Sequence, residues 1–284
     1  MELSDAQFKG LIGMMIDASE NVLLYWKDPD MEVRQKQDAS PLTLADTTTN
    51  LMICQFLQSI SDIPVISEEG ESRPEYAFRQ KHAWVWLVDP LDGTKEFVKG
   101  GDDFTVNVGL VHDGGPVFGM VSRPVTRELY LGWVADDKLV MGIELKCGAY
   151  RLKWDPGMDS GTMLQKLEPI HVRGHHPIRI VASKSHMNAE TERFLKMFPD
   201  KSLVNMGSSL KIIAVAEGKA DLYPRLGPTS EWDTCAAHAI LSAAGGKLMS
   251  LELVEGGYEL KPCLYNKETL LNPWFLAFGT VKPF

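Results

Sequence analysis

The chain has 284 residues, of which 44% are hydrophobic and 24% charged, as is ordinary for a globular protein built around one or two well-formed cores. Its 38 acidic and 29 basic residues give a net charge of −9, which argues against a nucleic-acid polymer or a membrane surface as the partner of the whole protein. No hydrophobic run approaches the ~20 residues that span a bilayer, and no basic region precedes an apolar one at the amino terminus, so we expect a cytoplasmic protein.

Two helices are expected near the start of the chain. Apolar residues recur at helical spacing over residues 5–27, and again from about residue 43 to residue 57 or 60. Ser4 or Asp5 can cap the first helix. Asp46 falls in the first turn of the second helix, where an acid either serves the helix dipole alone or has a function. The sequence by itself leaves both interpretations open.

Two predicted strands are followed by acidic residues. The short run 63–67 precedes Glu68, and the longer apolar run that starts at Trp84 ends in Asp89 and Asp92. Open α/β sheets usually hold their ligands at the carboxyl ends of strands. The sequence therefore places carboxylates where a ligand site is expected.

The turn after the longer run is predicted to be rigid. Pro90 fixes its own φ angle, and Gly93 allows a turn that residues with a Cβ atom resist. Asp89 and Asp92 are then held close together, with the hydroxyl of Thr94 beside them. Confined carboxylates repel each other, and a hard divalent cation with oxygen ligands relieves that repulsion.

Further apolar or alternating runs predict an antiparallel meander that forms one broad sheet flanked by the first two helices. These runs are residues 104–112, 117–124, 128–134 and 138–145. Residues 146–166 carry glycines, a proline and weak periodicity, and we expect an irregular excursion there.

Strands and helices alternate in the last part of the chain. We expect strands at residues 178–182, 202–205 and 220–223, and helices at residues 189–197, 210–217 and 234–244. The change of pattern places a soft domain boundary near residue 175. Asp233 stands just before the last helix as a natural N-cap, and capping alone would explain an isolated aspartate there.

Three motifs follow one another along the chain: Ser67-Glu68-Glu69, then Asp89-Pro90-Leu91-Asp92-Gly93-Thr94, then Trp232-Asp233. In order and spacing they resemble the lithium-sensitive, magnesium-dependent phosphomonoesterases. That superfamily includes inositol monophosphatase, fructose-1,6-bisphosphatase, inositol polyphosphate 1-phosphatase and 3′(2′),5′-bisphosphate nucleotidase. The resemblance covers essentially the whole chain.

Other stretches are similar to the bacterial bisphosphate nucleotidases within that superfamily. They are residues 40–46, 92–97, 207–211, 223–229 and 271–273. Lys95-Glu96-Phe97 is informative, because inositol monophosphatases usually have Thr-Asn-Phe after the Gly-Thr pair. The segment 146–166 departs from the pattern, since compact bacterial relatives have a shorter connection there.

The resemblance implies a mixed α/β fold, a layered α-β-α-β-α sandwich of the inositol monophosphatase type. Residues 1–175 would form a metal-binding α+β domain with a large, mostly antiparallel sheet, and residues 176–284 an α/β domain for substrate recognition. Two or three Mg²⁺ ions would be bound at a site between them. The implied ligands are Glu68, Asp89, Asp92, Asp233 and the backbone carbonyl of Leu91.

The resemblance also implies roles in catalysis and substrate binding. Asp46 and Thr94 would activate the attacking water, with Glu68 in the catalytic set. Lys36 matches a basic position near the site. The implied substrate contacts are Gly93, Thr94, Ser183, His186, Gly207, Ser208, Lys211, Arg225 and Asp233. Lys211 and Arg225 suit a substrate that carries a phosphate at each end of a ribose.

The activity implied is hydrolysis of the 3′-phosphate of adenosine 3′,5′-bisphosphate to AMP and phosphate, which recycles a by-product of sulfate assimilation. The 5′-phosphosulfate relative is a further candidate substrate, and the expected partner is a small phosphorylated nucleotide. The protein would be a monomer or a homodimer. Two alternatives stay open: an inositol-phosphate phosphatase, and a nucleotide-binding regulator without turnover, against which the intact set of acids argues.

Overall fold

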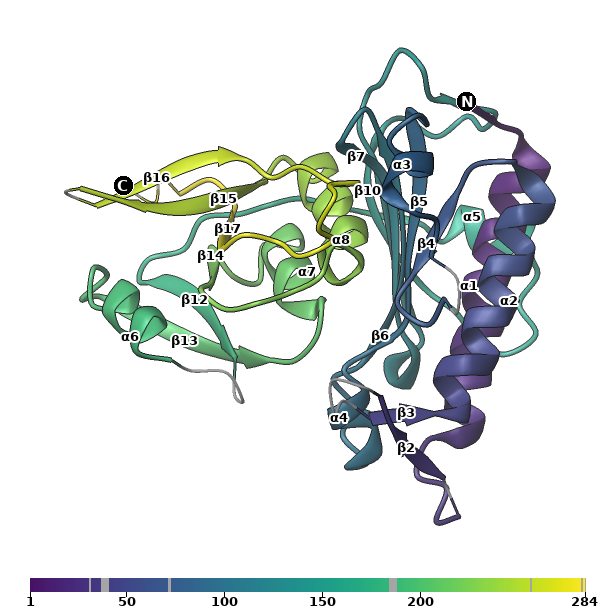
Figure 1. The fold of residues 1–284 in the computed structure, drawn as a ribbon, viewed down its shortest axis with the longest axis horizontal. Coiled ribbons are helices and arrows are strands. Elements are labelled where there is room, and N and C mark those ends of the chain that lie inside the picture. The colour runs from purple at the N-terminus through teal and green to yellow at the C-terminus, as the bar shows by residue number, and fades with distance from the viewer. Residues whose placement is uncertain are drawn as a thin grey trace.

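The structure is a computed structural model that describes residues 1–30, 32–36, 41–70, 73–183, 188–255, 257–281 and 283. Helices and sheets alternate in layers (Figure 1): the pair α1 (Asp5–Tyr25) and α2 (Leu44–Ile60), a seven-stranded sheet, the helices α7 (Leu210–Ala216) and α8 (Glu231–Ala243), a six-stranded sheet, and α6 (Ala189–Leu195). This confirms the predicted α-β-α-β-α sandwich. No helix in the described ranges is long and apolar enough to cross a membrane.

The first two helices begin and end close to the predicted residues. The side chain of Ser4 accepts a hydrogen bond from the backbone N–H of Gln7, and the Gln7 side chain returns one to the N–H of Ser4, which fixes the start of α1. Thr43 caps α2 in the same reciprocal way with Asp46. Both helices pack their apolar faces on the seven-stranded sheet, where they form one core with it.

The seven-stranded sheet is antiparallel except at one edge. Its order is β11 (Glu168–Ile170), β10 (Gly148–Lys153), β8 (Glu128–Trp133), β7 (Gly115–Arg123), β6 (Thr105–His112), β5 (Trp84–Asp92) and β4 (Val65–Ser67). β4 runs parallel to β5, and all other neighbours are antiparallel. At this parallel edge Glu68 follows the end of β4, and Asp89 lies on the neighbouring strand β5.

The predicted fourth strand of the meander is wrong. Within residues 138–145 only β9 (Val140–Met141) is a strand, and it pairs with β1 (Glu2–Leu3) in a separate small sheet. The alternating apolar residues of that segment do pack on the core, but the segment does not join the seven-stranded sheet. The true next strand is β10, which lies in the segment predicted to be irregular; that segment also holds α5 (Ser160–Gln165).

The six-stranded sheet has a parallel half and an antiparallel half. Its order is β13 (Lys201–Met206), β12 (Ile178–Ser183), β14 (Leu222–Arg225), β17 (Phe275–Phe278), β15 (Lys247–Val254) and β16 (Gly257–Pro262). The strands β12, β13 and β14 confirm predictions, with ends shifted by one or two residues. The strands β15 to β17 were not predicted from the sequence.

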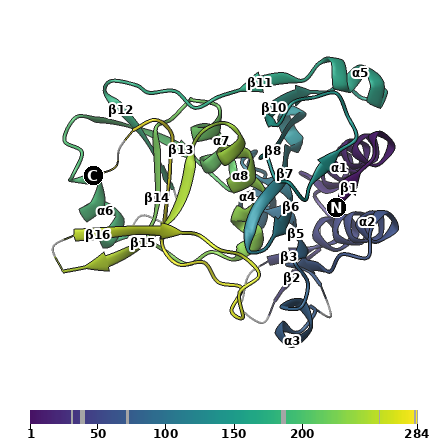
Figure 2. The same ribbon diagram turned by 90° about the horizontal axis from the view of Figure 1, so that it is seen from above.

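Helix α8 joins the two sheets. It lies between them (Figure 2) and packs against β5 to β8 of the first sheet as well as β15 of the second. Gly109, Gly119 and Gly132 lie side by side on β6, β7 and β8, and a Cβ atom on Gly119 would stand 2.1 Å from the carbonyl oxygen of Ala236. The row of glycines therefore lets the helix backbone lie directly on the sheet.

Candidate active site

A β-bulge puts the two aspartates of β5 on the same face of the sheet. Asp89 lies opposite Asn107 and Asp92 opposite Thr105, so β5 has one more residue than β6 in this interval. Residues three apart on a regular strand point to opposite faces, and the extra residue corrects this. Pro90 suits the bulge because it has no N–H to leave unpaired.

Three carboxylates from three elements meet at this point. Glu68 follows β4, Asp89 belongs to β5, and Asp233 lies in the first turn of α8; one oxygen of each falls within 4.8 Å of the others. Burial, and then the neighbouring acids, raise the pKa values of Asp89 and Asp233 well above their usual range. Ionising these carboxylates together therefore costs free energy, and a bound cation would offset that cost.

The sequence predicted Asp233 as the N-cap of α8, but in the structure Asp233 lies inside the helix. The helix begins earlier, at Glu231, because Ser230 caps it and exchanges reciprocal hydrogen bonds with Asp233. The carboxylate accepts from the N–H of Ser230 at 2.8 Å. Asn272 donates to the carbonyl of Ser230 at 2.6 Å and so holds the cap in place. One oxygen of Asp233 therefore fixes the helix start, and the side chain also reaches the acidic cluster.

The donors around the cluster are all hard oxygens. Leu91 adds a backbone carbonyl, which accepts from the Thr94 hydroxyl at 3.0 Å, and Asp92 adds a carboxylate whose charge raises the pKa values of Asp89 and Asp233. Carboxylates and carbonyls are the ligands that Mg²⁺ prefers. Lys36 also pairs with Glu68, at 2.8 Å, and with Glu69. The residues present fit a divalent cation.

Asp46 and Thr94 form a hydrogen-bonded pair beside the cluster. The Thr94 hydroxyl lies 3.2 Å from one oxygen of Asp46, and the other oxygen accepts from the N–H and hydroxyl of Thr43 at 2.7 and 2.6 Å. Burial raises the pKa of Asp46. Thr94 opens α4 (Thr94–Val98) directly after Gly93, which has a φ of +93° and so makes the turn between β5 and α4.

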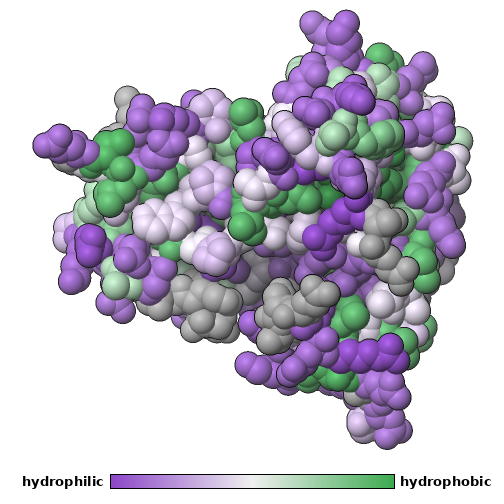
Figure 3. Space-filling model, in the orientation of Figure 1, coloured by the Kyte–Doolittle hydropathy of each residue, from purple (hydrophilic) through white to green (hydrophobic). Residues whose placement is uncertain are grey.

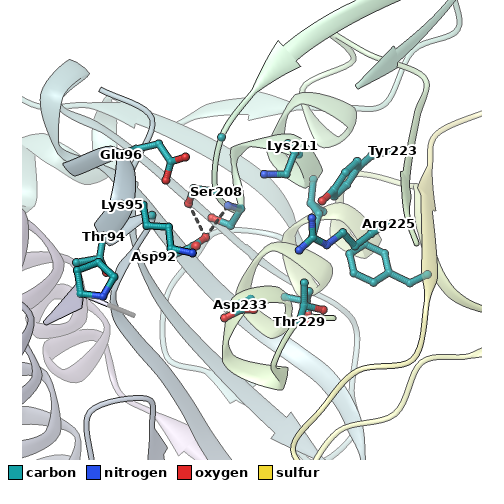
Figure 4. Close-up of a pocket in the computed structure, with 17 residues that line it drawn as sticks. Asp92, Thr94, Lys95, Glu96, Ser208, Lys211, Tyr223, Arg225, Thr229 and Asp233 are labelled. Carbon is teal, nitrogen blue, oxygen red and sulfur yellow. Dashed lines mark hydrogen bonds between the residues drawn. The ribbon is translucent and has the colours of Figure 1, made fainter. Parts of the chain in front are cut away.

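A pocket next to the acids is lined by cations. Lys95, Lys211 and Arg225 line it together with Asp92 and Asp233, and Figure 4 shows the cations and the acids in one pocket. Lys211 is buried, which lowers its pKa to about 8. On the face seen in Figure 3 the molecule is hollowed between the two sheets, with hydrophilic side chains at the rim. The pocket suits an anionic ligand.

Most of the predicted substrate contacts line this pocket. Gly93, Thr94, Gly207, Ser208, Lys211, Arg225 and Asp233 do. The hydroxyl of Ser208, however, donates to Asp92. Ser183 ends β12, but its side chain lies outside the described residues, and so does His186.

The pocket also has lining residues that the sequence analysis did not assign. They include Lys95, Glu96, Tyr223 and Thr229. Lys95 and Glu96 belong to the stretch that distinguishes the nucleotidases, so a signal was present. Arg73 was missed as well: its guanidinium lies 4.5 Å from the ring centre of Trp232 and binds the carbonyls of Ser67 and Glu68, linking the two motifs.

Comparison with known sequences agrees with this architecture. The sequence model of the inositol monophosphatase family matches residues 7–273. The chain belongs to the inositol monophosphatase family. Among curated family members, the 3′(2′),5′-bisphosphate nucleotidase CysQ of Salmonella typhimurium is 39% identical over 247 residues, which are 86% of this chain and 88% of the relative. CysQ of Escherichia coli K12 is 38% identical over the same shares.

Solved structures of family members share the fold. The crystal structure of CysQ from Bacteroides thetaiotaomicron is 39% identical, with a TM-score of 0.76 over 95% of this chain and 96% of that one. An inositol monophosphatase from Thermotoga maritima is 19% identical, with a TM-score of 0.67 over 96% and 92% of the two chains. The second likeness shows the layered fold alone.

Proposed function

We propose that the protein is a Mg²⁺-dependent phosphomonoesterase that removes the 3′-phosphate of adenosine 3′,5′-bisphosphate, giving AMP and phosphate. The observation that carries the proposal is the acidic cluster of Glu68, Asp89 and Asp233 at the edge of a cation-lined pocket. The curated relatives at 38–39% identity, named 3′(2′),5′-bisphosphate nucleotidases, support the same substrate class.

Each of the two phosphates of the substrate would face positive charge in the site. The phosphate to be removed would face the acids through the metal, with Glu68, Asp89, Asp92, Asp233 and the Leu91 carbonyl as ligands of two or three ions. When bound, the ions supply positive charge that stabilises the transferring phosphoryl group and make water more acidic. The second phosphate would bind Lys211 and Arg225, with Lys95 nearby; Lys211 is 8% exposed, so its charge is weakly screened by solvent.

Asp46 and Thr94 would handle the proton of the attacking water. The Thr94 hydroxyl lies 3.2 Å from Asp46 and 3.0 Å from the Leu91 carbonyl oxygen, and its single proton can go to either. During the reaction it would donate to Asp46, which leaves a lone pair to accept a hydrogen bond from water. As the water oxygen bonds to phosphorus and the bond to the ribose oxygen breaks, the water proton would pass toward Asp46 through Thr94, and the departing ribose oxygen would take a proton from a solvent water to give the 3′-hydroxyl of AMP. The raised pKa of Asp46 makes its carboxylate a better base than an exposed aspartate.

The test is a comparison of phosphate release from adenosine 3′,5′-bisphosphate, inositol 1-phosphate and AMP, each with and without Mg²⁺. We expect rapid Mg²⁺-dependent release from the first, slow release from the second and none from AMP. Lys211→Gln should raise the KM for the bisphosphate and leave that for inositol phosphate unchanged. Faster turnover of inositol phosphate would contradict the proposal, and binding of the bisphosphate without release would point to a regulator.

The proposed substrate indicates which class of reaction comes before this one. The supplying reaction must leave adenosine 3′,5′-bisphosphate behind, as transfer of a sulfuryl group from its 5′-phosphosulfate derivative does. We propose that this protein clears that by-product, in keeping with a role in sulfur metabolism. The 5′-phosphosulfate itself belongs in the substrate panel, because its 3′-phosphate presents the same group to the acidic cluster.

A further inference from the structure

The turn before α7 is bonded to the acidic edge of the first sheet. The N–H of Ser209 donates to Oδ2 of Asp92 at 2.7 Å, and the hydroxyl of Ser208 donates to the same oxygen. Ser208 and Ser209 belong to the helix layer next to the second sheet, whereas Asp92 ends β5 of the first. One oxygen of Asp92 is therefore held by a distant part of the chain.

A second row of hydrogen bonds supports the first. The Thr105 hydroxyl lies 2.6 Å from that of Ser208 and 2.9 Å from that of Ser209, and Ser209 donates to Oδ1 of Asn107 at 2.9 Å. Ser208 gives its proton to Asp92 and Ser209 gives its proton to Asn107, so Thr105 is left as the donor in this group, and its single proton goes to one of the two serine oxygens. Thr105, Asn107 and Ser209 are each at most 3% exposed, so the network is shielded from water.

The backbone of this turn is shaped for the contact. Ser208 has a φ of +52°, in the left-handed region that serine seldom adopts. Gly207 lies directly over Asp103, where a Cβ atom would come within 2.8 Å of the Asp103 side chain, and its N–H donates to that carboxylate at 3.2 Å. The close approach and the unusual φ together bring the Ser208 hydroxyl and the Ser209 N–H to one carboxylate oxygen.

We propose that Ser208 and Ser209 are positioning residues for Asp92, which tie the metal affinity of the acidic edge to the docking of the second half of the molecule. They hold Oδ2, so Oδ1 is the oxygen left to face the cation. This inference rests on the proposed function for the metal, and it assigns Ser208 a different task from the substrate contact that its motif suggested. Partners that orient a metal ligand in this way commonly change metal affinity by about 10- to 100-fold.

The experiment measures metal binding apart from catalysis. Ser208→Gly removes the hydroxyl and also relieves the positive φ, so a loss of affinity cannot come from backbone strain. Mn²⁺, which takes the same oxygen ligands as Mg²⁺, is titrated into the substrate-free protein while the resonance of the free ion is followed by electron paramagnetic resonance. We expect the Kd for Mn²⁺ to rise roughly 10-fold and the Mg²⁺ concentration for half-maximal rate to rise in parallel. The KM at saturating Mg²⁺ should stay within about 2-fold of the wild-type value, since the hydroxyl would act through Asp92.

A second variant separates positioning from substrate contact. Thr105 does not line the pocket, so Thr105→Val should weaken Mn²⁺ binding without changing the KM. Ser202→Ala removes an exposed hydroxyl on β13 and serves as the control, with thermal melts confirming that all variants fold. Unchanged Mn²⁺ affinity in Ser208→Gly together with a 10-fold higher KM would overturn the proposal. A protein that releases phosphate from no substrate would instead contradict the proposed function, while the Mn²⁺ titration would still test the positioning.

Discussion

Lys211 shows how a single residue can be placed for binding at a cost to folding. Its side chain is buried beside the ring of Tyr223, with the nitrogen 5.7 Å from the ring centre. Desolvation lowers its pKa from 10.5 to about 8, although the charge of Asp92 raises it in part. An anionic substrate would restore the lost solvation, so the residue is better suited to the complex than to the free protein.

The pH dependence of kcat/KM should report this lysine. Because kcat/KM follows the ionisation of the free enzyme, it should fall as pH rises through about 8, where Lys211 loses its charge. Lys211→Arg keeps the charge to much higher pH, so the fall should move above pH 9 in that variant even if the overall rate is lower. Initial rates from pH 6 to 10 with the bisphosphate substrate test this. A fall near pH 8 that persists unchanged in Lys211→Arg would exclude Lys211 as its source.

Removing the buried charge should stabilise the free protein. The folded pKa lies below the unfolded one, so the unfolded chain binds more protons between pH 8 and 10.5 and stability rises with pH across that window; below pH 8 the full cost, at most ~3 kcal/mol, is present. Lys211→Met should therefore raise the free energy of unfolding by about 1–3 kcal/mol at pH 7, measured by urea titration. Lys196→Met, at an exposed position on the second half, is the control and should change it by less than about 0.5 kcal/mol.

Substitutions at Thr94 and at Asp233 should impair different properties of the enzyme, the first kcat and the second metal binding. Thr94→Ala removes the hydroxyl that lies beside Asp46 and that would link it to the attacking water in the proposed mechanism, so we expect kcat to fall by roughly 10²- to 10³-fold with metal affinity kept. Asp233→Asn removes a carboxylate from the acidic cluster and should raise the Mg²⁺ requirement instead. Rates across a Mg²⁺ series separate the two, and Thr94→Ser should recover most of the rate. Wild-type rates in Asp233→Asn at low Mg²⁺ would show that α8 contributes no ligand.

At the scale of elements, the junction from β5 to α4 depends on one bulge and one glycine. The bulge brings Asp89 and Asp92 to one face, and Gly93 then turns the chain with a φ of +93°. A Cβ atom on Gly93 would lie 3.0 Å from the carbonyl oxygen of Asp103. The position of Thr94 therefore depends on a residue with no side chain.

Gly93→Ala should damage both stability and activity. An alanine at positive φ costs about 1–2 kcal/mol, and the contact with Asp103 adds to it, so we expect a loss of about 2 kcal/mol and a reduced kcat. Gly157→Ala is the matched control: its φ is +79°, but no atom lies within 4 Å of the added Cβ, so only the backbone cost applies. Urea titrations and rates at saturating Mg²⁺ distinguish the two. Equal activity in both variants would show that α4 can shift without harm.

The sequence predicted elements where side-chain pattern and backbone pairing coincide, as in α1, α2 and β12 to β14. It failed over residues 138–153 because an alternating apolar segment can pack on a core without joining a sheet. The acids were identifiable because each follows a strand or begins a helix. Their mutual distances, and the hydrogen bond from Ser208 to Asp92, depend on how distant segments pack. A local sequence pattern contains no information about that packing. The placement of the N-cap of α8 failed by three residues because Asp233 caps from within the helix.

At the scale of the whole molecule, the site exists because α8 lies directly on the first sheet. Two parts of the helix matter. Its first turn brings Asp233 to Glu68 and Asp89, and the rest of the helix packs against both sheets. The glycine row of Gly109, Gly119 and Gly132 sets how near the helix can come. These glycines are 10 and 13 residues apart in the sequence and become one row only through the register of β6, β7 and β8.

Gly119→Ala should therefore separate the two halves of the site. Its Cβ atom would stand 2.1 Å from the carbonyl oxygen of Ala236, a backbone atom that cannot move without the helix. We expect a loss of stability of about 1–3 kcal/mol, as overpacked cores show, and a weaker Mn²⁺ affinity because Asp233 withdraws from Glu68 and Asp89. Gly115→Ala, on the same strand, is the control: the added Cβ would have only an ordinary contact at 3.5 Å, so both quantities should stay near wild type. If Gly119→Ala lost stability but bound Mn²⁺ as tightly as the control, the distance between helix and sheet would not govern metal binding. The position of Asp233 would then not depend on the contact between α8 and the glycine row.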